Sequence, residues 1–197
     1  MSLLNLITST YCLCGQPNLN LCLKCRSQLS PKLTRPLPHI DQCWTLSSYQ
    51  GPVKSAILAY KSGRRNQLPA LIAGLEITLA ATGIAQGAIV GIPSTQAKFA
   101  ERGFETIGSL VRGLAKARGW PVENPLSFAK SVSEQVGLGR ATREQNLAGA
   151  FIAKRVISGT VVLVDDIVTT GATATAAASA LRVAGAQSIF LICLCRV

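Results

Sequence analysis

Two adjacent carboxylates and a hydroxyl-rich turn follow an apolar run towards the C-terminal end of the chain. The run, residues 161–164, is apolar throughout, which predicts a strand that is buried on both faces. It is followed by Asp165 and Asp166, and then by a turn that contains Thr169, Thr170, Gly171, Ala172 and Thr173. Residues 172–184 are small and helix-prone, and Gly185 stands where a glycine often ends a helix. The segment therefore predicts a strand, a turn and a helix, and open α/β sheets bind ligands at such a junction.

The predicted turn has the groups that bind a phosphate. Backbone N–H groups and the positive end of the helix dipole would face an anion, and Gly171 allows a close approach of the backbone. The carboxylates of Asp165 and Asp166 would repel a phosphate, but they suit the vicinal hydroxyls of a polyol or the water shell of Mg²⁺. We therefore expect both carboxylates and the turn to hold one sugar phosphate. The alternative is that Asp166 caps the helix and Asp165 is solvated.

Four cysteines near the N-terminus have the spacing of a zinc site; they are Cys12, Cys14, Cys22 and Cys25. The second pair is a Cys-x-x-Cys, whose two thiolates can reach one ion. The first pair is a Cys-x-Cys, so Cys43 is an alternative fourth ligand. We expect a structural Zn²⁺, because a segment this short has no core of its own. The alternative is four reduced cysteines around a loosely packed loop.

Length and charge set the domain organisation and the kind of partner. A chain of 197 residues suits one α/β domain with a small appendage. We assign residues 1–38 to a cysteine-rich module and a proline-containing linker, and residues 39–197 to the α/β domain. Twenty Lys and Arg against nine Asp and Glu give a net charge of +11, which favours polyanions such as nucleic acids or sugar phosphates. A solvated basic face is the alternative.

No signal peptide is apparent in the sequence, and no membrane span is expected. The longest apolar tract, residues 68–93, is interrupted by Glu76 and by glycines, and it predicts a helix followed by a strand at residues 88–92. We expect a cytoplasmic protein whose seven cysteines do not form a disulfide framework.

Residues 161–173 resemble the signature with which type I phosphoribosyltransferases bind phosphoribosyl pyrophosphate. Further segments are similar to the competence protein F (ComF) family, namely residues 49–54, 60–64, 102–104, 134–140 and 143–151. The similarity extends from about residue 12 to the C-terminus. Two positions depart from the family pattern, since Glu105-Thr106 stands where Asn-Gln is usual and Gly139 stands where Ser is usual.

The resemblance implies a parallel sheet flanked by helices, with a small zinc-ribbon-like module at the N-terminus. It implies that Asp165 and Asp166 take the ribose hydroxyls, that residues 169–173 wrap the 5′-phosphate, and that Mg²⁺ accompanies the pyrophosphate. In the family, the ribose C1 becomes oxocarbenium-like as pyrophosphate leaves, and nearby carboxylates would stabilise that charge. The family is associated with the uptake of single-stranded DNA in natural transformation, so DNA and DNA-uptake proteins are the implied partners.

Basic residues elsewhere in the chain are candidates to meet the same anion. Lys61 begins a basic turn after a predicted helix at residues 53–60, and it could bind pyrophosphate or simply be C-terminal helix charge. Arg102 lies in a basic loop after the predicted strand.

A polar, glycine-containing stretch at residues 131–146 predicts a mobile loop that closes over the site. We expect Arg140 and Arg143 in this stretch to contact pyrophosphate or a DNA backbone.

Three functions are compatible with these patterns. The first is a DNA-processing accessory protein of competence that binds single strands and senses or uses phosphoribosyl pyrophosphate. The second is a metabolic phosphoribosyltransferase that transfers ribose 5-phosphate to a nitrogen acceptor. The third is a sensor of phosphoribosyl pyrophosphate without catalysis. No segment convincingly supplies a nucleobase-reading hood, which disfavours the second, and the 5% aromatic content limits stacking platforms for DNA in the first.

Overall fold

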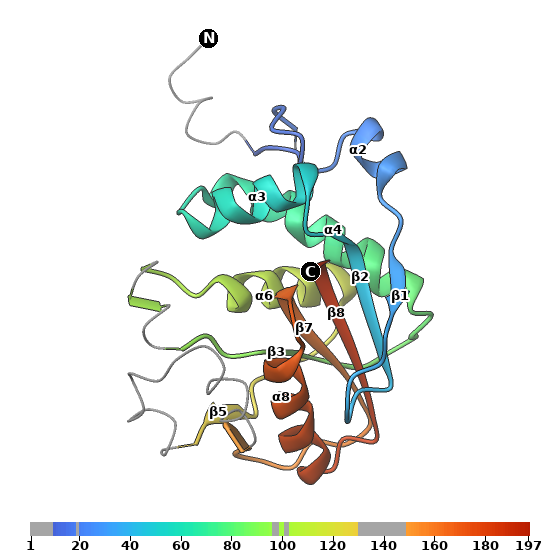
Figure 1. Cartoon of the computed structure of the whole chain (residues 1–197), viewed down its shortest axis with the longest axis vertical. Coiled ribbons are helices and arrows are strands. Elements are labelled where there is room, and N and C mark those ends of the chain that lie inside the picture. Colours follow the sequence, from blue (N-terminus) through green and yellow to red (C-terminus); the bar gives the residue numbers. More distant parts are fainter. Residues whose placement is uncertain (1–9, 19, 96–98, 101–102, 130–148) are drawn as a thin grey trace.

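The computed structural model describes residues 10–18, 20–95, 99–100, 103–129 and 149–197. Its centre is a six-stranded sheet with the strand order β1-β2-β8-β7-β3-β4 (Figure 1). The strands are β1 (Lys32–Thr34), β2 (Gln42–Ser48), β8 (Ser188–Arg196), β7 (Thr160–Val168), β3 (Ala88–Gly91) and β4 (Val122–Glu123). All neighbours are parallel except β1, which runs antiparallel to β2 at one edge. The predicted α/β fold with a mainly parallel sheet is confirmed.

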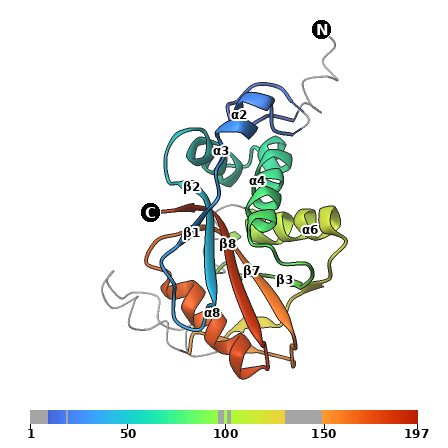
Figure 2. The ribbon, with the colours of Figure 1, turned by 90° about the vertical axis from the view of Figure 1, so that its right-hand side faces the viewer.

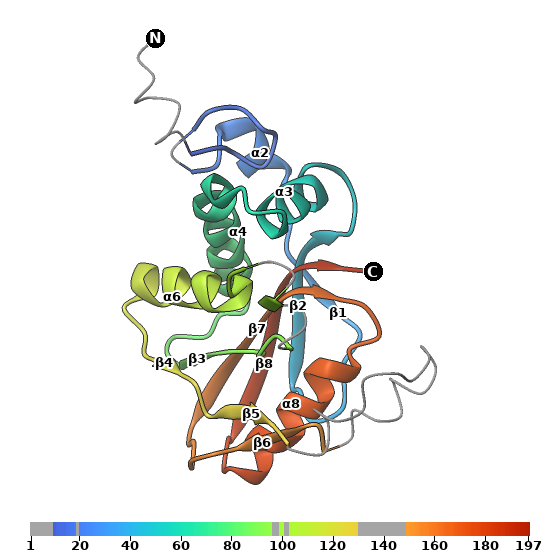
Figure 3. The ribbon, with the colours of Figure 1, turned by 90° about the vertical axis from the view of Figure 1, so that its left-hand side faces the viewer.

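Helices cover both faces of this sheet, as Figures 2 and 3 show. One face carries α3 (Gly51–Lys61), α4 (Leu68–Ala81) and α6 (Thr106–Arg118). The other carries α8 (Ala172–Val183) and a two-stranded sheet of β5 (Leu126–Phe128) and β6 (Phe151–Ala153). Because both faces are covered, the central strands are apolar on both sides, and every residue from 161 to 164 is 0% exposed.

The segment predicted as a linker contains a strand. Residues 32–34 form β1, which pairs with residues 43–45 of β2 and extends the sheet by one edge strand. The prolines at positions 31, 36 and 38 flank this strand and do not interrupt its ladder. Three residues were too short a run to predict as a strand, because their pairing depends on the neighbouring β2. Within the described part of the chain, no helix has the length and apolar character that crossing a bilayer requires.

The chain reverses the direction in which it builds the sheet between β7 and β3. From β3 it passes through α6 to β4 on one side, and from β7 it passes through α8 to β8 on the other. The two connecting helices lie on opposite faces, so the loops that leave β3 and β7 diverge at the carboxyl edge of the sheet. Ligand sites of open α/β sheets lie outside such a reversal point.

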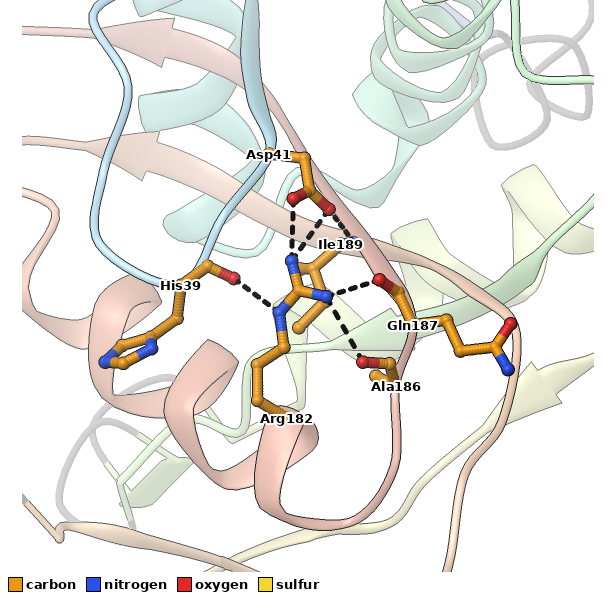
Figure 4. A network of polar contacts seen from close by, with 6 residues as sticks. All are labelled: His39, Asp41, Arg182, Ala186, Gln187 and Ile189. Atoms are coloured by element: carbon orange, nitrogen blue, oxygen red, sulfur yellow. Dashed lines mark hydrogen bonds and ion pairs between the residues drawn. The ribbon is translucent and has the colours of Figure 1, made fainter.

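At the amino edge of the sheet, Arg182 of α8 joins three chain segments (Figure 4). Its Nη2 lies 2.8 Å from both carboxylate oxygens of Asp41, which precedes β2. Asp41 also accepts a 2.7 Å hydrogen bond from the N–H of Ile189 in β8. The other partners of the guanidinium are backbone carbonyls, those of His39, Ala186 and Gln187. This network attaches the end of α8 to the beginnings of β2 and β8.

We expect Arg182→Lys to lower the free energy of unfolding by about 2 kcal/mol, because an ammonium group cannot reproduce the planar fork of donors. Urea denaturation measures this loss. Arg155→Lys is the matched control, since the Arg155 side chain is 55% exposed and pairs with Glu123 at the surface. The control should change stability by less than about 1 kcal/mol. Equal losses in the two variants would contradict a structural role of the Arg182 network.

Candidate functional site

The turn after β7 surrounds a small hollow at the carboxyl edge of the sheet. The lining comprises Asp165 and residues 167–174, and the free space is about 240 Å³ when the open mouth is included. All five turn residues that the sequence singled out line this hollow; they are Thr169, Thr170, Gly171, Ala172 and Thr173. The structure therefore brings one carboxylate and the whole hydroxyl-rich turn together at the point where the strand order reverses.

A glycine sets the backbone of this turn. Gly171 is the N-cap of α8 and has a φ of +83°, a conformation that other residues rarely adopt. A Cβ at this position would also lie 2.5 Å from Cδ1 of Leu37. Leu37, from the segment before β2, thus packs directly against the turn. The positive φ explains why a glycine is favoured here, and any side chain would also have to displace the methyl groups of Leu37.

The N-terminal turn of α8 presents backbone donors to the hollow. The first helical hydrogen bond runs from the N–H of Thr175 to the carbonyl of Gly171, at 2.8 Å. The N–H of Ala172 donates to the hydroxyl of Thr170 at 3.3 Å. The N–H groups of Thr173 and Ala174 precede the first helical hydrogen bond and have no acceptor within the helix. Together with the helix dipole, they form a site that favours an anion.

The two carboxylates of the doublet point in different directions, because successive side chains of a strand lie on opposite faces of the sheet. Asp165 lines the hollow, and its Oδ1 accepts a 2.8 Å hydrogen bond from the N–H of Asp166. The Oδ2 of Asp166 lies 2.8 Å from Nζ of Lys61, the last residue of α3. Asp166 is only 8% exposed.

The expectation that both carboxylates face the turn therefore holds for Asp165 and not for Asp166. The alternative in which Asp166 caps the helix is also wrong, since the N-cap is Gly171 and no side chain bonds there. Lys61 and Asp166 were both predicted as residues of this site, but their ion pair was not predicted. No local pattern could have revealed it, because the two residues are far apart in the chain.

An aromatic cluster joins the end of α3 to the loop after β3. The rings of Tyr60 and Phe104 meet edge-on with centroids 5.4 Å apart, and the guanidinium of Arg65 lies 4.8 Å from the Phe104 centroid. Burial raises the pKa of Tyr60, so its hydroxyl stays protonated and donates to the carbonyl of Thr106 at 3.2 Å. Phe104, to which the sequence analysis gave no role of its own, thus connects two segments that border the site.

Three residues proposed from the sequence, Arg102, Arg140 and Arg143, lie outside the described residues, as does the whole of the expected mobile loop at residues 131–146. A larger hollow of about 980 Å³, open mouth included, lies between β6 and α8. Its lining includes Lys154 and Arg155, but it is otherwise mainly aliphatic and contains no carboxylate for the hydroxyls of a sugar. The smaller hollow is therefore the better candidate for a sugar phosphate.

The four N-terminal cysteines gather into one cluster. Their sulfur atoms all lie within 4.8 Å of one another, and those of Cys14 and Cys22 are 3.9 Å apart. Four sulfurs at 2.3 Å from a tetrahedral Zn²⁺ would be about 3.8 Å apart. Backbone N–H groups donate to two of the sulfurs, from Cys22 to Cys12 at 3.2 Å and from Cys25 to Cys22 at 3.4 Å. The donor set and its geometry fit Zn²⁺.

Cys43 does not belong to this cluster. It lies in β2 and is buried in the core on the α8 side of the sheet, whereas Cys12 and Cys25 are buried in the core on the α3 side. Of the two possible fourth ligands, the structure selects Cys12. The short Cys-x-Cys spacing is accommodated because residues 12–16 turn back on themselves, with the N–H of Cys12 bonded to the carbonyl of Gln16.

Local hydrogen bonds and burial act in opposite directions on the thiols of the second pair. A hydrogen bond from the N–H of Cys25 is the main reason why the pKa of Cys22 falls to about 7. A large part of Cys22 is therefore thiolate at neutral pH, the form that binds metal. Burial raises the pKa of Cys25, so a bound cation would be needed to keep that sulfur ionised.

The cysteine cluster is attached to the α/β domain next to the candidate site. Cys12, Leu13 and Cys25 belong to the same core as α3 and α4. The N–H of Tyr11 donates to the carbonyl of Asn66 in the short 3-10 helix η1 (Arg65–Gln67), at 3.0 Å. The segment that contains Arg65 is therefore braced by the cysteine cluster on one side and by Phe104 on the other.

Comparison with known proteins places these features in a family. Residues 67–197 match the model of the phosphoribosyl transferase domain. The chain is 30% identical over 192 residues to the DNA utilization protein YhgH of Salmonella typhimurium, which covers 93% of this chain and 82% of that protein. The protein of the same name from Escherichia coli K12 is 29% identical over 192 residues, with the same coverage.

Among solved structures, the glutamine phosphoribosylpyrophosphate (PRPP) amidotransferase from B. subtilis, complexed with ADP and GMP, matches with a TM-score of 0.41 and 28% identity. The match covers 60% of this chain and 25% of that one.

The family model covers more than half of the chain, and the YhgH proteins match nearly all of it. The resemblance seen in residues 161–173 and in the ComF-like segments is thereby confirmed. The chain belongs to the phosphoribosyl transferase domain family.

Proposed function

We propose that this protein binds phosphoribosyl pyrophosphate at the hollow after β7 and serves in the handling of single-stranded DNA in the cytoplasm. The observation that carries the first part is the grouping of Asp165 with the turn residues 169–173 at the reversal point of the sheet. Donors and an acceptor lie side by side there, as a phosphorylated pentose requires. The second part is supported by the net charge of +11 and by the name DNA utilization protein that the relatives carry.

Each group at the hollow has a role in this proposal. The 5′-phosphate takes the N–H groups of Thr173 and Ala174 and the threonine hydroxyls, and Asp165 takes the ribose hydroxyls. Pyrophosphate is a competing anion for Lys61, whose present partner, Asp166, is directed away from the hollow. Mg²⁺, bound with the substrate, would neutralise charge on the pyrophosphate, and Asp165 is the carboxylate placed to hold its water shell. Arg102, Arg140 and Arg143 remain candidates for the pyrophosphate.

Asp165→Asn should weaken the binding of phosphoribosyl pyrophosphate in the presence of Mg²⁺ by about 10- to 100-fold, because hydrogen bonds to a charged group are worth about 1.5–3 kcal/mol. Titration calorimetry measures the affinity. Glu123→Gln is the matched control, since it makes the same acid-to-amide change on β4 and should bind like the wild type. If Asp165→Asn binds as tightly as the control, the assignment of the pentose to this hollow is wrong.

We further propose that the cysteine cluster holds one structural Zn²⁺, and metal analysis of the purified full chain tests this. The wild type should contain about one zinc per chain, because four sulfur ligands complete a closed tetrahedral site. The double variant Cys22→Ser/Cys25→Ser should lose the metal, whereas Cys43→Ser should retain it. Zinc-free wild type, or equal zinc in all three proteins, would refute the site.

A further inference from the structure

The positive charge of this protein is concentrated in its N-terminal part. Residues 1–75 contain eight Lys and Arg and one acid, Asp41, which gives +7, whereas residues 76–197 contain twelve Lys and Arg and eight acids, which gives +4. The one acid in the first part is already paired with Arg182. Among residues 1–75, no other acid is present to offset the remaining positive charge.

The end of α3 and the turn after it present these charges in a row. Lys54, Leu58 and Lys61 are spaced i, i+4 and i+7, so they lie on one stripe of α3, about 10 Å long from Lys54 to Lys61. Leu58, between the two lysines, is 48% exposed. Arg64 and Arg65 continue the row beyond the helix, and both are exposed. We call these five residues the α3 ridge.

Aromatic rings support the ridge near both of its ends. The ammonium of Lys54 lies 5.0 Å from the ring centroid of Tyr49, and the guanidinium of Arg65 lies 4.8 Å from that of Phe104. Among the described residues, neither cation forms an ion pair with a carboxylate. Other arginines, such as Arg155 and Arg182, are occupied by acids. The two cation–ring pairs thus leave charge available while holding each cation over a flat apolar face.

The ridge also has a defined place relative to the sugar-phosphate hollow. Tyr49 follows the carboxyl end of β2, Phe104 lies in the loop after β3, and Lys61 contacts Asp166 at the end of β7. The ridge therefore runs along the carboxyl edge of the sheet, where the hollow opens.

We propose that the α3 ridge, with Tyr49 and Phe104, is the surface that binds single-stranded nucleic acid. Lys54, Arg64 and Arg65 are the cations of the ridge that can contact successive phosphates, because Lys61 is paired with Asp166. Flat groups beside such cations stack unpaired bases, a combination typical of single-strand binding. A duplex would meet the charges, but its bases are already stacked on one another and would not stack on the two rings or contact Leu58. The class of partner, single-stranded DNA, rests on the proposed function, and the α3 ridge is the place on the molecule where we infer that it binds.

A salt series separates this surface from general charge attraction. The affinity of the full chain for an oligo(dT) of about 20 nucleotides is measured by fluorescence anisotropy from 50 to 300 mM salt, as log K against log [salt]. Lys54→Gln/Arg64→Gln/Arg65→Gln should make the negative slope of this plot shallower by about 2, since each phosphate contact contributes about 0.7 to its magnitude. At 0.1 M salt this corresponds to about a 100-fold loss of affinity. The matched control is Lys32→Gln/Lys116→Gln/Lys154→Gln, which removes the same charge from exposed positions on other elements.

The control should retain at least most of the slope and affinity of the wild type, and thermal unfolding checks that both triple variants are folded. Tyr49→Leu should lower the affinity for oligo(dT) about 5- to 100-fold without changing the slope, because it removes stacking and no charge. Equal losses in the two triple variants, or equal wild-type affinity for a duplex of the same number of phosphates, would overturn the location. If the wild type binds no DNA even at 50 mM salt, the DNA part of the proposed function fails with it.

Discussion

The reversal of strand order between β7 and β3 is the constraint on which the rest of the site depends. The connections from β3 and β7 lead to helices on opposite faces of the sheet, so the loops after these two strands separate. A crevice can form between them at the edge of the sheet without disturbing the core. The turn after β7 can then place a partly buried helix N-terminus next to a strand end. Gly171 makes the tight approach possible, and Leu37 from a distant segment fills the space that a side chain would have taken.

Alternation along β7 divides the acidic doublet between two environments. Asp165 stays in the polar, partly exposed surroundings of the turn, while Asp166 is buried on the α3 side and needs Lys61 to offset the cost of burying its charge. Asp165 thus lines the hollow at the turn, and Asp166 is held by the ammonium group of Lys61. The pair connects the chemistry of the doublet to the position of α3.

The cysteine cluster packs against the α/β domain and shares its hydrophobic core. Cys12 and Cys25 complete the core above α3 and α4, and the backbone of Tyr11 is bonded to η1. A module of this size gains stability from such packing and from the metal that its donor set fits. The bond from Tyr11 to Asn66 also supports the segment that contains Arg64 and Arg65.

The sequence by itself determined the strand, the turn and the helix around Asp165 and the grouping of the four N-terminal cysteines, whereas β1 was not predicted. The continuous apolar run of 161–164, the helix-prone stretch ended by Gly185 and the cysteine spacing are local patterns, and local patterns can be read without knowing the fold. Tertiary structure alone decided which carboxylate faces the turn, which cysteine completes the cluster and which cations meet aromatic rings. The physical reason is that these outcomes depend on partners such as Lys61, Leu37 and Phe104, which lie far away in the chain and are brought close only by the packing of helices on the sheet.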